Sequence, residues 1–297
     1  MQTRARRRFG ARRLGYLMLV PALIMILLTQ IYPFLYGVLM SLTNYNLLKP
    51  QAIRFVGLEN FVKIFTSDRN FTSTLGFTFA YALSIVLFSY IVGLFTATLL
   101  NKNLRGRAAY RTVILLPWVI APMVMATNWL WLLNDQFGLI NRVLMQLGIV
   151  REPILFLASK DMARSSVILV GTWKNIPFMT ITLLAGMQSI GTDLYEAARI
   201  DGAGGFKAFW HITLPMIRPV AVVSTTLLLI WAFNGFENVY LLTEGGPSSA
   251  TMLMSIYAYN TAFLRSQMGY ASALSVVMLG FMMALSLIYQ RMNRNLT

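Results

Sequence analysis

Long apolar stretches alternate with short polar segments along the whole chain. A helix needs about 20 apolar residues to cross the roughly 30 Å hydrocarbon core of a membrane. Six stretches reach that length. They are too continuously apolar for barrel strands, so their backbone N–H and C=O groups must be satisfied by hydrogen bonds within helices. The six predicted spans are 14–42, 72–100, 112–133, 165–189, 219–238 and 267–289.

Composition agrees with this pattern. Apolar residues make up 57% of the 297 residues and charged residues only 12%, about half the usual soluble share. A soluble fold could not cover so much apolar surface, and no stretch between the spans is long enough for a separate soluble domain. We therefore predict an all-α integral membrane fold, with residues 1–297 forming a single domain of six transmembrane helices.

The distribution of lysine and arginine predicts the orientation. With a cytoplasmic N-terminus, the inside segments carry 15 of these residues in 61 positions and the outside segments carry 9 in 88. Positive residues accumulate on the cytoplasmic side, so both termini are expected inside. The net charge is +15, and the basic residues that produce it lie at the ends of the spans, where they can contact anionic lipid head groups. We therefore expect no nucleic-acid partner.

The sequence carries no constellation typical of catalysis or metal binding. It has no cysteine and one histidine, His211, without other metal-ligating residues nearby in the sequence. The segment Gly202–Gly205 lacks the lysine and the preceding strand of a phosphate-binding loop. We expect no catalytic residue, no metal site and no cofactor in this chain.

One polar segment stands between the fourth and fifth spans and reads E-A-A-x3-G-x9-I-x-L-P over Glu196–Pro215. Its charged residues would each cost several kcal/mol in hydrocarbon, so the segment must lie in water or against a soluble partner. Alanines permit close approach of another chain, and the glycines permit a turn. The pattern predicts two short helices around a glycine-rich bend.

This segment resembles the cytoplasmic coupling loop of the membrane subunits of binding-protein-dependent ABC importers. Four further blocks, 55–61, 111–117, 173–178 and 242–247, are similar to the sugar-importing branch of that family. The resemblance implies a type I importer fold with the coupling loop at 190–218. The residues expected to couple to an ATPase are Glu196, Ala197, Ala198, Asp201, Gly202, Ile212, Leu214 and Pro215.

The resemblance also implies partners and a location. The chain would form half of a pathway with a second homologous six-helix subunit, in a bacterial or archaeal cytoplasmic (inner) membrane. Two copies of a cytoplasmic ATPase would bind ATP and Mg²⁺ and act through the coupling loops. An external solute-binding protein would deliver a di- or oligosaccharide or a sugar derivative.

Polar groups at membrane depth indicate where a substrate could rest. Lys174 and Glu237 are the only charged residues inside the predicted spans, and such residues usually line a cavity or pair with each other. Asn234 precedes Glu237 by three positions, one helical turn. With the positions implied by the resemblance, the expected substrate-binding residues are Trp118, Lys174, Asn175, Phe178, Trp231, Asn234 and Glu237.

Other interpretations remain open on the residues alone. The aromatic residues could be ordinary helix packing, and Lys174 could be a structural partner of Glu237. A secondary transporter or channel driven by an ion gradient would also show six spans with internal charges, although it would not need a coupling loop. An ABC permease for glycerol phosphate, phosphate, a metal or an amino acid could share the loop, whereas the blocks at 173–178 and 242–247 favour a sugar.

Overall fold

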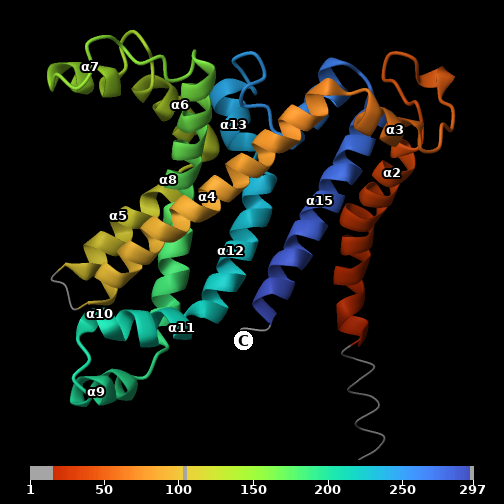
Figure 1. Cartoon of the computed structure of the whole chain (residues 1–297). Helices are drawn as coiled ribbons and strands as arrows, with labels where there is room; N and C mark the ends of the chain where they lie inside the picture. The colour runs from red at the N-terminus through yellow and green to blue at the C-terminus, as the bar shows by residue number, and fades with distance from the viewer. Residues whose placement is uncertain (1–15, 103–105, 295–297) are drawn as a thin grey trace, which may run out of the picture. The chain divides into compact units, whose positions relative to one another are not determined.

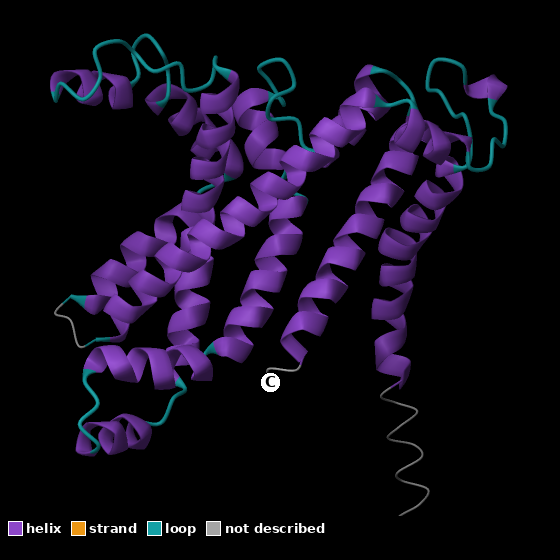
Figure 2. Ribbon diagram, viewed as in Figure 1, coloured by secondary structure: helices purple, strands orange, loops and turns teal. Residues whose placement is uncertain are grey.

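The structure is a computed structural model that describes residues 16–102 and 106–294. Those residues are helical, with turns and loops between the helices, and they contain no β-strand, only an isolated bridge between Thr43 and Phe55 (Figure 2). The all-α prediction is therefore confirmed. The basic N-terminal segment that contributes to the predicted orientation lies outside the described residues.

Within the described residues, four helices are long and apolar enough to span a membrane: Tyr16–Ser41, Arg69–Asn101, Lys160–Gln188 and Met268–Arg291. Two bent pairs, Ala108–Val119 with Pro122–Leu132 and Gly205–Met216 with Arg218–Phe233, raise the number to six if each pair is one span. The structure thus gives four to six candidate spans, and the exact count of six stays a prediction.

Two predicted spans differ from the structure in their continuity. The span predicted at 112–133 consists of α5 (Arg107–Val119) and α6 (Pro122–Leu132), bent by 95° at the break. The span predicted at 219–238 ends earlier: α12 (Arg218–Phe233) stops before Gly235, and α13 (Phe236–Thr243) begins after it. Apolar composition continues across both breaks, so hydropathy alone does not reveal them, whereas proline and glycine mark them.

The chain divides into two compact units. The first contains described residues 16–67 and 258–277, and the second contains 68–257, apart from the gap at 103–105, together with 278–294. The single-domain prediction is not tested by this division. Each unit is described by itself below.

The first unit contains the apolar helix Tyr16–Ser41, which includes the π-helical turn η1 (Leu27–Ile31) and α2 (Tyr32–Ser41). Its loop holds η2 (Pro50–Ala52) and α3 (Glu59–Thr66), and η4 (Asn260–Leu264) lies in its later segment. The Asn60 amide donates to the carbonyls of Ser41 and Thr43, both at 2.8 Å. Asn60 therefore ties α3 to the loop that follows α2.

The second unit is built on α4 (Arg69–Asn101) and α8 (Lys160–Gln188). The two helices approach closely at glycines: a Cβ on Gly93 would lie 2.8 Å from Met179. A Cβ on Gly171 would lie 2.7 Å from the Ile85 side chain. Small residues at helix interfaces are typical of membrane bundles, where close packing replaces the hydrophobic effect between helices.

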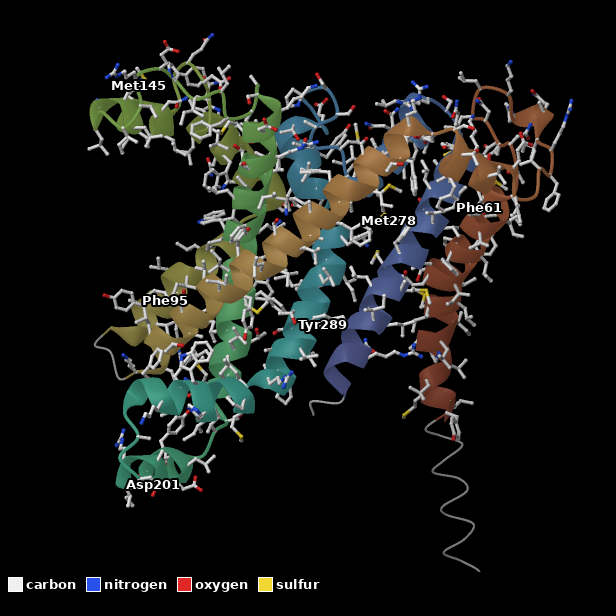
Figure 3. The ribbon with its side chains drawn as sticks, viewed as in Figure 1. Phe61, Phe95, Met145, Asp201, Met278 and Tyr289 are labelled. Carbon is white, nitrogen blue, oxygen red and sulfur yellow. The ribbon has the colours of Figure 1, made fainter. Side chains whose placement is uncertain are left out.

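The start of α14 (Met254–Tyr259) and the later part of α15 (Met268–Arg294) also belong to the second unit. α14 begins where the backbone N–H of Met254 donates to Thr78 Oγ1 on α4 at 2.9 Å. The later part of α15 lies beside α12, and Tyr289 and Thr225 share a hydroxyl hydrogen bond of 2.5 Å (Figure 3). These contacts join the start of α14 to α4 and the later part of α15 to α12.

The second unit places two sets of short helices at its opposite ends (Figure 1). One end carries α9 (Thr192–Ile200), α10 (Gly205–Ala208) and α11 (Leu214–Met216), which follow α8. The other end carries α6, α7 (Leu139–Gln146) and α13. The length of α8 separates the predicted coupling loop from α6 and α7.

Candidate coupling loop and transport site

The predicted coupling loop begins with α9 and turns at Gly202. The Gly202 N–H donates to the Arg199 carbonyl at 3.1 Å, and the Ala203 N–H donates to the Ala198 carbonyl at 2.8 Å. Gly202 has a φ of +76°. These two bonds and the left-handed residue form a Schellman motif, which ends a helix by satisfying its last carbonyls. The structure thus has a helix that ends in a glycine turn, as the sequence pattern predicted for this segment.

The chain returns through one continuous helical segment, Gly205–Met216. It contains α10, the π-helical turn η3 (Phe209–Thr213) and α11. Tyr195 Oη and Thr213 Oγ1 lie 2.9 Å apart and join α9 to this segment. The hydroxyl pair holds the two helices of the loop together across the bend.

The coupling residues differ in exposure. Glu196, Ala197, Asp201, Gly202 and Pro215 are exposed, and Asp201 lies at the outer tip of the loop (Figure 3). Ala198, Ile212 and Leu214 are half-buried. The structure thus places the carboxylates and the bend where a soluble partner could reach them.

Within Glu196–Pro215, three large apolar residues are also exposed, and the sequence pattern did not select them. Ile200 is 87% exposed, Phe206 is 79% exposed and Trp210 is 51% exposed. They flank the bend inside a segment chosen for its polarity. Large apolar side chains in a segment that cannot enter lipid are the signal that could have identified them, because such patches mark interaction surfaces.

Three predicted substrate residues from three helices meet as an aromatic trio, which comprises Trp118, Phe178 and Trp231. The ring centroids of Trp118 and Phe178 are 6.2 Å apart, and those of Phe178 and Trp231 are 4.8 Å apart. Trp118 on α5 and Trp231 on α12 are each about half exposed, at 48% and 47%. Aromatic faces that remain open can contact the apolar C–H faces of a sugar.

Lys174 bonds to Asn238, a residue that was not among the partners considered from the sequence. Its Nζ donates to Asn238 Oδ1 at 3.0 Å, and no hydrogen bond or ion pair within the described residues joins it to Glu237. In this structure the alternative pairing with Glu237 gives way to a charge-assisted bond to an amide. This bond connects α8 to α13.

The two predicted asparagines have unequal freedom. Asn175 Nδ2 donates to the Gly171 carbonyl at 2.7 Å, within its own helix. Asn234 is exposed at the end of α12, and Glu237 is exposed in the first turn of α13. Because a helix break separates them, Asn234 and Glu237 are not one turn apart on the same helix, as the spacing suggested.

The sequence missed two residues of this region, Asn238 and Tyr81. Tyr81 is fully buried, and a Cβ on Gly171 or Gly235 would lie 2.9 or 3.0 Å from its side chain. Both glycines are thus needed for α8 and the α12–α13 break to close around Tyr81. The sequence shows that Asn238 follows Gly235 by three positions, but its pairing with Lys174 is apparent only in the structure.

A scan against family models matches residues 89–297 to the family described as "binding-protein-dependent transport system inner membrane component". The trehalose/maltose transport system permease protein of Thermococcus litoralis is 35% identical, with 97% of this chain and 96% of that protein covered. The sulfoquinovosyl glycerol transport system permease protein of Agrobacterium fabrum is 33% identical, with 96% and 92% covered.

Among solved structures, the chain resembles a chain of a bacterial ABC transporter involved in the import of the acidic polysaccharide alginate. The TM-score is 0.85 at 25% sequence identity, and the match covers 99% of both chains. The fold is therefore that of an ABC importer permease. Together these matches establish that the chain belongs to the binding-protein-dependent transport system inner membrane component family.

Proposed function

We propose that this chain is the permease subunit of an ATP-driven importer and forms half of the translocation pathway for a carbohydrate. The observation that carries the proposal is the exposed Glu196–Pro215 loop at one end of the second unit (Figure 1). A secondary transporter has no need for such a docking segment. The relatives described above transport trehalose or maltose, sulfoquinovosyl glycerol and alginate according to their names, which supports a sugar as the substrate.

The coupling step follows from the loop geometry. A cytoplasmic ATPase would bind the carboxylate of Glu196 with a basic residue and cover the exposed side chains of Ile200 and Phe206. The Schellman turn at Gly202 and the Tyr195–Thr213 bond make the loop a stiff unit. Movement of the ATPase would then pass through α8 and α12, the helices on either side of the loop.

The transport site is proposed at the aromatic trio and the Lys174–Asn238 bond. The half-exposed rings suit the apolar face of a pyranose, and Lys174, Asn234 and Glu237 offer partners for its hydroxyls. Lys174 also suits an acidic sugar, because it is the only cation within the predicted spans. ATP and Mg²⁺ are assigned to the separate ATPase, and no chemical step is assigned to this chain.

The decisive experiment is reconstitution of the complete complex in proteoliposomes. It would contain this chain, a second permease subunit, two copies of the ATPase and the solute-binding protein. We expect uptake of radiolabelled trehalose, maltose or alginate oligosaccharide that requires ATP and the binding protein. Uptake that persists without ATP and follows an imposed ion gradient would instead support the secondary-transporter alternative.

The orientation is tested separately by cysteine labelling. The native chain has no cysteine, so Ala203→Cys in the loop and Ser248→Cys between α13 and α14 each introduce a single labelling site in this chain. With the loop in the cytoplasm, an impermeant maleimide added outside intact cells should label only the Ser248 variant, and a permeant one should label both. Labelling of the Ala203 variant by the impermeant reagent would invert the orientation.

A further inference from the structure

A cleft of about 600 Å³ opens on the second unit beside the break between α5 and α6. Its walls come mainly from α6, with Trp173 contributed by α8. We call it the tryptophan cleft. The residues that define it are Asn128, Trp129, Trp131 and Trp173, with Met125 and Leu132 beside them.

The aromatic walls of the cleft are held in place by ring contacts. Trp129 and Trp173 meet edge to face, with centroids 5.5 Å apart. Trp131 meets Phe137 in the same manner at 5.9 Å and remains 69% exposed. Flat indole faces that stay open are suited to stacking against the C–H faces of a sugar ring.

The cleft also presents polar groups without partners. Within residues 16–102 and 106–294, no hydrogen bond engages the Asn128 amide or the indole N–H groups of Trp129, Trp131 and Trp173. A lipid chain has no acceptor for these donors, whereas the hydroxyl and ring oxygens of a sugar have several. The combination of open indoles and free donors favours a hydroxylated ligand over a hydrocarbon one.

In the proposed orientation, with the coupling loop in the cytoplasm, the cleft lies before the transport site on the route inward. α6 lies at the end of the unit opposite the coupling loop (Figure 1). Trp173 precedes Phe178 of the aromatic trio by five residues, about 7.5 Å along α8. Trp173 also directly precedes Lys174, so the cleft and the transport site are consecutive along one helix.

We propose that the tryptophan cleft is a second sugar subsite, which holds one pyranose ring of the incoming sugar before that ring reaches the aromatic trio. This inference rests on the proposed carbohydrate function. The cleft has room for at least one ring, and pockets of this size hold small ligands. A subsite of this kind allows a longer sugar to occupy the cleft and the aromatic trio at the same time.

The test compares uptake by the reconstituted complex carrying Trp131→Ala or Asn128→Ala with uptake by the unmodified complex. We expect the rate of trehalose and maltose uptake to fall roughly threefold to tenfold, because each variant removes one contact to the sugar. Trp131→Phe keeps an aromatic face and should restore most of the rate. Phe95→Ala, which removes an exposed aromatic outside the cleft (Figure 3), should leave uptake unchanged.

Occupancy is measured directly with Asn128→Cys, the single cysteine of this chain. The sugar-loaded binding protein should slow maleimide labelling in the complex, and the empty binding protein should not. Equal protection by the sugar-loaded and the empty binding protein would mean that a protein covers the cleft. Quenching of the cleft's indole fluorescence by brominated acyl chains would mean that lipid fills it. Either result overturns the subsite.

The two hypotheses fail in different ways. Failure of the unmodified complex to transport any of the sugars would reject the carbohydrate function itself. Normal sugar uptake by the unmodified complex together with unchanged uptake by Trp131→Ala and Asn128→Ala would reject only the subsite.

Discussion

The predicted coupling loop and the proposed transport site lie in the same unit, yet their structures arise differently. The loop is local: its Schellman turn joins Ala198 to Ala203, and its hydroxyl pair joins Tyr195 to Thr213. The transport site is assembled from distant segments, since Trp118, Phe178 and Trp231 come from three helices. Local geometry follows from residue order. The geometry of a site assembled from distant segments depends instead on how the helices pack and where they break.

The difference extends to the type of partner that each region can take. The loop exposes carboxylates and large apolar side chains together, a combination suited to a protein surface. The transport site exposes only parts of its rings and keeps Lys174 bonded to Asn238. We therefore expect changes in the loop to affect coupling to ATP, and changes in the site to affect the sugar.

The largest effect is expected from Gly202→Pro. Proline holds φ near −65°, but Gly202 adopts +76°, so the turn cannot form and the cost is about 3 kcal/mol or more. Substrate-stimulated ATPase activity in proteoliposomes should fall on the order of tenfold to a hundredfold. The matched control is Gly204→Ala, where φ is −69° and no atom lies within 4 Å of the added Cβ; it should remain active.

Glu196→Lys should have the next largest effect. The carboxylate is exposed, and no residue in the described part of this chain bonds to it, so it is available to a partner cation. Reversal of its charge should lower stimulated ATPase activity roughly tenfold, because a charge-assisted bond is lost and repulsion replaces it. Amounts of membrane-inserted protein should be normal. Full stimulation in this variant would show that the loop does not bind through Glu196.

The Lys174–Asn238 bond predicts a coupled pair. Lys174→Ala and Asn238→Ala should each lower sugar uptake about fivefold, since each removes a hydrogen bond to a charged group. The double variant should be little worse than either single one, as expected for residues that share one interaction. A double variant of Lys174→Ala with Glu237→Gln should show no comparable coupling. Coupling to Glu237 rather than Asn238 would restore the original pairing hypothesis.

The sequence predicted the loop more completely than the site for a physical reason. The spacing of Glu196, Gly202 and Pro215 lies within 20 residues, and the glycine turn requires no distant contact. The apolar pattern likewise located the helices, but it cannot reveal a 95° bend between two apolar segments. The break at Gly235 resets the helical register, so Asn238, and not Glu237, meets Lys174. The packing of α8 against α13 determines which of these two residues bonds to Lys174.

The smallest effect is expected from Asn234→Ala, which is compared with Asn175→Ala in the same proposed site. Asn175 already donates one amide N–H to the Gly171 carbonyl, so its side chain is held against its own helix. Asn234 is exposed at the end of α12 and is bound to no side chain in the described residues. Asn234→Ala should lower sugar uptake roughly twofold to fivefold, the value of one hydrogen bond.

Asn175→Ala is the matched control for this prediction, because it makes the same chemical change on the neighbouring helix α8. Its uptake should stay near that of the unmodified complex, since the side chain satisfies its own helix rather than the ligand. Initial rates at a subsaturating concentration of sugar-loaded binding protein would resolve the difference. The reverse order, with Asn175→Ala the more damaging, would mean that the intrahelical bond opens when sugar binds. Availability of a side chain in this structure would then not predict contact with the sugar.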